Sequence, residues 1–191
     1  MNLLGNGLYL ATHYEDALPV REAEVSLLRR LGIPLERMLT AQNNLASTYS
    51  MLGRSEEALN MYRDILSRQV RLHGEEHEES VVAAYNYATS LFELPRFEEA
   101  KSLLRKTVPV ARRILGESHE LTLKTRRVYA VALYLDPDAT LDNLREAVTT
   151  LEEAAPRARR VLGGAHPTTT GIELELQAAR AALRARETPS A

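Results

Sequence analysis

A self-similarity at an offset of 42 residues constrains this sequence more than any other feature. The segment NNLASTYSMLGRSEEALNMY (Asn43–Tyr62) aligns without a gap with YNYATSLFELPRFEEAKSLL (Tyr85–Leu104), and a third copy begins at Arg127. The third copy carries five additional residues, DATLD, and a truncated earlier copy occupies the N-terminus. Repeats of this length are typical of solenoids, in which each unit is a pair of stacked helices.

Equivalent positions in the copies have side chains of similar size. Two positions per repeat are small: Gly5, Ala46, Ala88 and Ala130 on the first helix, and Ala17, Ala58, Ala100 and Ala147 on the second. Large side chains fill the neighbouring positions on the first helix: Leu4, Leu45, Tyr87, Tyr129, Leu8, Tyr49, Leu91 and Leu133. Because these positions share one helix face, the pattern predicts two antiparallel helices in close contact at the small residues.

Glycine and proline recur where each helix should end. The first helix of a pair is followed by Gly53, Pro95 or Pro137 at one position of the repeat. The second helix is followed by Gly32, Gly74, Gly116 or Gly163 at another. Proline does not continue a helix, and glycine adopts the left-handed conformation that ends one. The repeat therefore predicts a break after every helix.

The segment HGEEH (His73–His77) matches H-x-x-E-H, a pattern that supplies zinc ligands and a general base in some metalloproteases. Such a site needs both histidines on one uninterrupted helix, whereas Gly74 is predicted to end the helix between them. The other copies keep only the second histidine, as His119 and His166. We therefore interpret His77 as a residue that caps or packs the start of the next helix. The sequence predicts no metal site, no cofactor and no catalytic residue.

Bulk composition excludes several classes of partner. The chain has 24 basic and 26 acidic residues and a formal charge of −2, so no strong field favours nucleic acid or an anionic membrane. No apolar run approaches the roughly 20 residues of a membrane-spanning helix. The chain contains no cysteine, which is consistent with a reducing compartment, and the N-terminus lacks the features of a signal peptide. These observations predict a cytoplasmic protein.

The small–large–small pattern, together with EEA after the turn, resembles the tetratricopeptide repeat. The 42-residue version with NNLASTYSMLGRSEEA and the loop VLGGAHPTT (Val161–Thr169) is similar to the repeats of the kinesin light chain subfamily. HEAT repeats, which also run for about 40–47 residues, are the alternative, although they lack the paired alanine positions. The coiled coil by which a kinesin light chain binds its motor is missing, so we do not predict a motor partner.

The resemblance implies an all-α fold, a right-handed superhelical solenoid of antiparallel helix pairs. We expect one domain over residues 1–187, with units of about 1–33, 34–75, 76–117 and 118–164. A C-terminal capping helix over 167–187 would turn its alanines inward and its arginines and glutamates outward. Residues 188–191 would form a disordered tail.

In the family, the first helix of each pair lines the concave face, which binds an extended peptide. The corresponding positions predicted for peptide binding are Asn43, Asn44, Ser47, Tyr85, Asn86, Thr89, Arg127 and Val131. Phe92, Val128 and Tyr134 occupy further positions of this face. Asparagine both donates and accepts hydrogen bonds, so it suits the backbone of any peptide. The alternative is that the asparagines only face water and that Phe92 and Tyr134 pack between repeats.

These features predict a non-catalytic interaction scaffold for a protein or peptide ligand. Lys124, Arg126 and Arg127 would favour an acidic ligand, and the aromatic residues would hold apolar side chains. The alternative function is a structural unit that forms homo-oligomers by end-to-end stacking through the uncapped N-terminal end. A metallohydrolase built on His73–His77 is the third hypothesis, and the glycine between its histidines argues against it.

Overall fold

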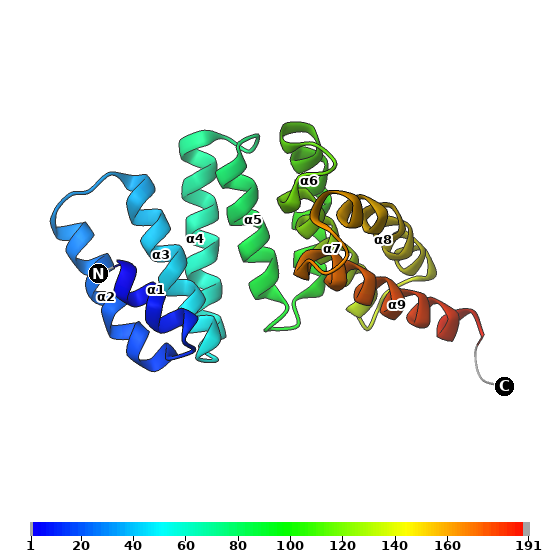
Figure 1. Cartoon of the computed structure of the whole chain (residues 1–191), viewed down its shortest axis with the longest axis horizontal. Coiled ribbons are helices and arrows are strands. Elements are labelled where there is room, and N and C mark those ends of the chain that lie inside the picture. Colours follow the sequence, from blue (N-terminus) through cyan, green and yellow to red (C-terminus); the bar gives the residue numbers. More distant parts are fainter. Residues whose placement is uncertain (1, 189–191) are drawn as a thin grey trace. The chain divides into compact units, whose positions relative to one another are not determined.

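The computed structural model describes residues 2–188, which form nine helices and no strand. Contacts between residues divide the chain into two compact units, Met1–Leu72 and His73–Ala191. The first unit contains α1 (Asn2–Leu10), α2 (Tyr14–Arg30), α3 (Leu35–Met51) and α4 (Ser55–His73). The second contains α5 (Glu78–Leu91), α6 (Phe97–Leu115), α7 (Glu120–Leu135), α8 (Leu141–Leu162) and α9 (Pro167–Glu187) (Figure 1). The prediction of an all-α helical repeat fold is confirmed.

Residues 189–191 of the tail predicted to be disordered lie outside the described residues. Thr188 is described, and its backbone amide donates a hydrogen bond to the carbonyl oxygen of Arg184 at 3.0 Å. None of the helices in the described part of the chain is long and apolar enough to cross a membrane.

The small positions of the repeat are buried in both units. Seven of them have no exposed surface: Ala17, Ala46, Ala58, Ala88, Ala100, Ala130 and Ala147 are each 0% exposed. Gly5, the eighth, is also buried, and a Cβ atom added there would lie 3.2 Å from Cγ of Arg21. The predicted pattern is therefore confirmed, because a larger side chain at these positions would force the paired helices apart.

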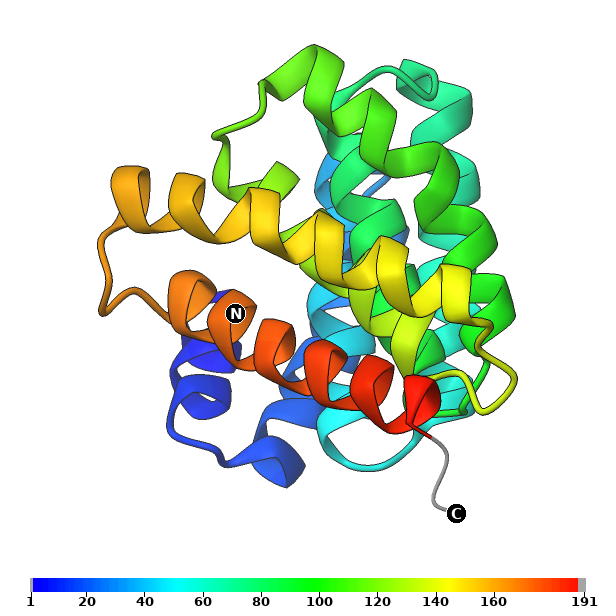
Figure 2. The same cartoon turned by 90° about the vertical axis from the view of Figure 1, so that its right-hand side faces the viewer.

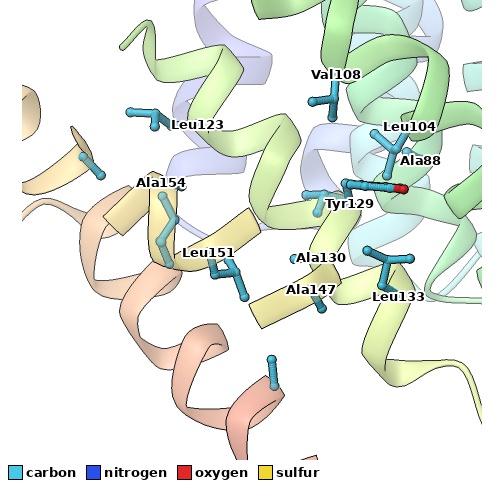
Figure 3. Close-up of a cluster of buried hydrophobic side chains, with 14 residues drawn as sticks. Ala88, Leu104, Val108, Leu123, Tyr129, Ala130, Leu133, Ala147, Leu151 and Ala154 are labelled. Carbon is cyan, nitrogen blue, oxygen red and sulfur yellow. The ribbon is translucent and has the colours of Figure 1, made fainter. Parts of the chain in front are cut away.

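The core of the second unit lies between α5, α6, α7, α8 and α9. Ala130 of α7 and Ala147 of α8 belong to it, with Leu104, Tyr129, Leu133 and Leu151 packed around them (Figure 3). Ile172 and Ala179 of α9 close the cluster on its C-terminal side. Since consecutive helices all contribute to one continuous cluster, each helix pair depends on the next pair for burial.

The core of the first unit is smaller. Val25 of α2 and Ala41 and Leu45 of α3 form a buried cluster, against which Tyr49 and Met61 pack. The position of Leu4 was predicted incorrectly: it is 60% exposed rather than packed against the paired helix. Helix α1 turns its glycine Gly5 towards Arg21 and Val20 of α2, and its Leu3, Leu4 and Leu10 are exposed.

Each second helix ends at glycine as predicted. Helix α4 ends at His73, and the following Gly74 has φ of 84°. Gly116 after α6 and Gly163 after α8 have φ of 91° and 90°. These are left-handed values that strain other residues, so the glycines set the ends of the helices.

The histidines after these glycines cap the following helices. His77, His119 and His166 are the N-cap residues of α5, α7 and α9. In each, Nδ1 accepts a hydrogen bond from the backbone amide two residues later, at 3.2, 3.3 and 3.2 Å respectively. The capping role proposed for His77 is confirmed. A ring nitrogen that accepts an amide hydrogen must be unprotonated, so the proton of the neutral imidazole lies on Nε2.

The five additional residues of the third repeat lengthen the turn between α7 and α8. Asp136 ends α7, and its Oδ1 accepts a hydrogen bond from the backbone amide of Asp138 at 3.0 Å. Thr140 then starts α8 through a capping box with Asn143. Asp136 thus ends one helix, and Thr140 of the insertion caps the next.

Helix α9 corrects one prediction about the C-terminal cap. Ala178, Ala181 and Ala185 were expected to point inward, but they are exposed, and Leu174 is 65% exposed. Charged residues of α9 instead pair with α8, which lies alongside it in Figure 2: Glu173 with Arg159 at 2.6 Å and Arg180 with Glu152 at 2.6 Å. The rotation of α9 that buries Ile172 and Ala179 in the core leaves Ala178, Ala181 and Ala185 facing outward.

The histidine caps make a testable contribution to stability. Replacing His119 by alanine removes the side-chain acceptor, so we expect the free energy of unfolding to fall by about 1 kcal/mol. His119→Asn keeps an acceptor of similar reach and should lose only a small part of that. Urea denaturation followed by circular dichroism measures both variants. Equal stability of His119→Ala and the unmodified chain would contradict the capping role.

Candidate functional site

In the first unit, the predicted peptide-binding residues lie on α3 opposite α1. Asn43, Asn44 and Ser47 are half-buried. The Ser47 hydroxyl shares a hydrogen bond with the Tyr9 hydroxyl at 2.7 Å, so residues 38 positions apart meet there. The structure therefore places Ser47 next to an aromatic residue of the preceding first helix.

Arg21 lies beneath this surface and was not anticipated from the sequence. Its guanidinium donates to the carbonyl oxygen of Asn44, to Thr48 Oγ1 at 2.7 Å and to Asn6 Oδ1 at 3.3 Å. The Tyr9 ring lies 4.5 Å from its Cζ atom in a cation–π contact. Arg21 is 4% exposed and has no carboxylate within 4 Å among the described residues. It is therefore a buried positive charge that the surrounding chain solvates with neutral groups.

Burial lowers the pKa of Arg21, and the remaining attraction of Glu24 opposes that effect. An arginine nevertheless stays protonated at neutral pH. A signal for this residue was present in the sequence: Arg21 lies four residues after Ala17, where the other repeats place Tyr62, Leu104 and Leu151 after their alanines. A charged residue at a position that is otherwise large and apolar marks this repeat as different.

In the second unit, the predicted residues of α5 differ in exposure. Tyr85 is half-buried and packs against the core cluster, and Asn86 is also half-buried. Thr89 is exposed, and its hydroxyl donates to the carbonyl oxygen of Tyr85 at 2.9 Å. Phe92 is half-buried and contacts Phe97, with ring centroids 5.8 Å apart. The aromatic residues here serve packing in part, as the alternative interpretation proposed.

On α7, the predicted residues Arg127 and Val131 are half-buried. Two further residues were assigned to this face incorrectly. Val128 is 5% exposed and belongs to the core cluster, because helix α9 packs on this side of α7. Arg126 is 2% exposed and pairs with Glu117 at 3.3 Å and with Glu153 of α8 at 2.8 Å. Neither residue is available to a ligand.

Arg127 crosses from α7 to α9. Its guanidinium lies over Gly171, where an added Cβ atom would be 3.3 Å from Cζ and would overlap one terminal nitrogen. Its Nε atom is buried and has no hydrogen-bond partner. No carboxylate lies within 4 Å of Arg127 among the described residues. A glycine in the middle of a helix costs about 1 kcal/mol relative to alanine, and the space that Gly171 leaves accommodates this guanidinium.

Tyr134 and Lys124 complete the surface around Arg127. The Tyr134 hydroxyl donates to a carboxylate oxygen of Glu175 on α9. Burial and this hydrogen bond raise the pKa of Tyr134, so its hydroxyl remains a donor at neutral pH. Lys124 pairs with Glu120 at 2.8 Å. Of the three cations expected to attract an acidic ligand, Arg127 is thus the one without an acidic partner among the described residues.

The candidate metal motif has a different arrangement. The His73 and His77 rings stack with centroids 4.2 Å apart and an interplanar angle of 14°. His77 Nδ1 is engaged by the backbone amide of Glu79. Within the described residues, no group of three or more histidine, aspartate or glutamate side chains is arranged to hold a metal ion.

Comparison with known proteins agrees with this geometry. Residues 37–107 match the family model of the tetratricopeptide repeat. A search of curated proteins gives no match.

Similar solved structures extend over nearly the whole chain. Two crystal structures of a Podosopora anserina protein, described as a kinesin light chain with nearly identical TPR-like repeats, align with TM-scores of 0.80 and 0.78. Both alignments have 22% identity and cover 96% of this chain and 85% of that chain. The crystal structure of BtubC (BKLC) from P. vanneervenii aligns with a TM-score of 0.78 and 17% identity, over 97% of this chain and 74% of that chain. The fold is therefore of the tetratricopeptide type and resembles kinesin light chain repeats, which is the predicted resemblance rather than the HEAT alternative.

Arg21 provides a test of the buried charge in the first unit. Replacing it with methionine keeps the apolar stem and removes a desolvated charge that has no counter-ion. We expect the free energy of unfolding to rise by about 1 kcal/mol. As a control, Arg126→Met removes a buried arginine that has two carboxylate partners, and it should lower the free energy of unfolding by about 2 kcal/mol. Equal losses in both variants, measured by urea denaturation, would contradict this account of Arg21.

Proposed function

We propose that this chain, whose fold is of the tetratricopeptide type, is a non-catalytic scaffold that binds an extended acidic segment of a partner protein. Repeats of this type are generally protein-interaction modules. The proposed surface of the second unit is formed by the first helices of its pairs, with Tyr85, Asn86 and Thr89 on α5 and Arg127 and Val131 on α7.

The unpaired guanidinium of Arg127 is the observation that carries this proposal. A half-buried cation without a counter-ion is costly, and a ligand carboxylate would relieve that cost through two parallel hydrogen bonds. Since the guanidinium already lies in the space that Gly171 leaves against α9, little additional ordering is needed when the ligand binds. Val131, half-buried on the same helix, offers apolar contact next to the charge.

Within the second unit, Asn86 of α5 would bind the ligand backbone. Asn86 is half-buried, and an asparagine amide can both donate to a peptide carbonyl and accept from a peptide amide. In the first unit, Asn43, Asn44 and Ser47 offer similar groups above the buried charge of Arg21. Both surfaces thus combine neutral hydrogen-bonding groups with a positive charge that lacks an acidic partner. An affinity in the micromolar range, about 8 kcal/mol, is expected of such a contact.

The test uses fluorescent ten-residue peptides that contain one leucine and zero, two or four glutamates. Binding measured by fluorescence anisotropy should strengthen with each added pair of glutamates. Arg127→Gln should weaken binding of the four-glutamate peptide about tenfold, because a charge-assisted hydrogen bond pair is lost. Its melting temperature should equal or exceed that of the unmodified chain, because a half-buried charge without a counter-ion is removed.

The matched control is Arg184→Gln, which removes an exposed arginine from the last turn of α9. This variant has the same net charge as Arg127→Gln and should bind the peptide like the unmodified chain. Equal binding by all three proteins, or affinities that do not change with glutamate content, would reject the proposal.

Gly171→Ala tests the position of the guanidinium rather than its charge. The added methyl group occupies the space of the Arg127 guanidinium and displaces it, while alanine favours the α9 helix. We expect weaker binding of the four-glutamate peptide together with an unchanged or higher melting temperature. Retained affinity would show that the resting position of Arg127 does not matter for binding.

Exposed leucines on α1 favour a second candidate function, the assembly of copies through the N-terminal end. Leu3, Leu4 and Leu10 are 91%, 60% and 82% exposed, and α1 carries no charged residue. Sedimentation velocity at increasing concentration should then show dimers or larger species, and Leu3→Glu with Leu10→Glu should abolish them. A strict monomer at high concentration would reject this alternative.

A further inference from the structure

Two adjoining cavities in the first unit form a groove where the end of α2, the start of α3 and the end of α4 come together, at the top of these helices in Figure 1. One has a volume of about 570 Å³ and the other of about 280 Å³, and Leu35 and Arg68 line both. We refer to the two cavities together as the α2–α4 groove. Asn43, Asn44 and Ser47 do not line it, so it is separate from the positions predicted for peptide binding.

The floor of the α2–α4 groove is apolar and open to solvent. Leu28 and Met38 are half-buried and pack against the core cluster of the first unit. Leu35 and Leu72 are 36% and 40% exposed, and Ile33 is half-buried in the loop before α3. Apolar surface of this kind is stabilised when the apolar side chains of another molecule cover it.

Three exposed arginines border the groove: Arg29 of α2, and Arg68 and Arg71 of α4. None of them has a carboxylate within 4 Å among the described residues. Arg29 and Arg71 lie near helix ends, where the helix dipole favours a cation, whereas Arg68 lies inside α4. Asp64 is the one acidic side chain among the described residues that line the two cavities. The groove therefore has an excess of positive charge.

The loop before α3 differs from the loop before α5, and the difference favours a binding site. At the offset of 42, residues 33–35 (Ile-Pro-Leu) occupy the positions of residues 75–77 (Glu-Glu-His). In the second unit, Glu76 pairs with Arg113 at 2.6 Å, and Arg113 is the equivalent of Arg71. Because proline replaces that glutamate in the first unit, the charge of Arg71 is not neutralised by the loop, and apolar side chains lie where polar ones stood.

We propose that the α2–α4 groove binds an amphipathic helix of a partner protein, with apolar side chains along one face and carboxylates beside them. The apolar face would cover Leu35 and Leu72, and the carboxylates would pair with Arg68 and Arg71. The groove is bordered mainly by the sides of helices, whose backbone groups already bond to one another, so it offers little to the backbone of an extended peptide. A helix makes its own backbone hydrogen bonds and is therefore the better occupant.

A membrane surface fits this groove less well than a helix does. The apolar side chains line a recess, whereas a membrane-binding surface must present them where they can enter the lipid. A partner helix can place its own side chains inside the recess.

The test uses the full chain labelled with ¹⁵N and a blocked helical peptide that has leucines along one face and glutamates on both sides of them. Titration should produce saturable shifts in the amide resonances of Leu35, Arg68 and Leu72. A peptide with glutamine in place of every glutamate should bind about tenfold more weakly, because the charge-assisted hydrogen bonds are lost. A peptide of the same composition with its leucines distributed around the helix should also bind about tenfold more weakly.

Two variants and a matched control test the residues of the groove. Arg68→Gln should weaken binding of the glutamate peptide about threefold, because an ion pair at an exposed site is lost. Arg63→Gln removes an exposed arginine from the same helix outside both cavities, and it should bind as the unmodified chain does. Pro34→Glu introduces the carboxylate that the next repeat has at this position. It should weaken binding about tenfold, because it neutralises Arg71 and repels the glutamates of the peptide.

Arg127→Gln should leave this binding unchanged, which separates the groove from the surface proposed in the second unit. Equal binding of the glutamine peptide, shifts that map elsewhere, or equal affinities of Arg68→Gln and Arg63→Gln would overturn the proposal. Binding to phosphatidylserine vesicles that depends on Arg68, with no binding of the helical peptide, would also overturn it.

Discussion

The close contact of paired helices at alanine is the interaction on which the rest of this structure depends. Each repeat places one small residue on its first helix and one on its second, and all of these except Gly5 are alanines that are fully buried. A methyl group is small enough to let helix backbones approach, so the larger residues beside it interlock around the contact. In the second unit, Leu104, Tyr129, Leu133 and Leu151 do so in one continuous cluster. The helix-ending glycines and the histidine caps then fix where each helix stops and the next one starts.

Because this core uses only part of each helix surface, residues on the remaining surface can differ between repeats. The buried arginines are an example. Arg126 and Arg21 are both buried arginines, yet Arg126 has two carboxylate partners and Arg21 has neutral ones. Arg127 and Asp136 likewise keep atoms without hydrogen-bond partners close to the surface. In native proteins, most buried polar groups make hydrogen bonds. A buried polar atom without a hydrogen bond therefore indicates either a ligand-binding role or a loss of stability that is kept for another reason.

The sequence predicted the fold well because its determinants are local and repeated. The small positions follow from residue size, and the ends of the helices follow from the backbone conformation of glycine. The role of His77 follows from capping chemistry, and a single repeat shows all three. The rotation of α9 could not be predicted, because it depends on which of its faces packs into the core cluster, where Ile172 and Ala179 are buried. Val128 was misassigned for a similar reason: its burial requires the position of α9 over α7. The sequence alone did not predict a role for Gly171, because that role depends on the Arg127 guanidinium that lies against it.

The size limit at the alanine contact can be measured directly by a series of substitutions at Ala100 of α6. Serine, valine and leucine at this position should lower the free energy of unfolding progressively as side-chain volume rises, by up to about 3 kcal/mol for leucine. The same residues at the exposed Ala178 of α9 should change it by no more than about 0.5 kcal/mol. A leucine at position 100 that leaves stability unchanged would show that the helices have room to spare there, and the packing account given for this fold would be wrong.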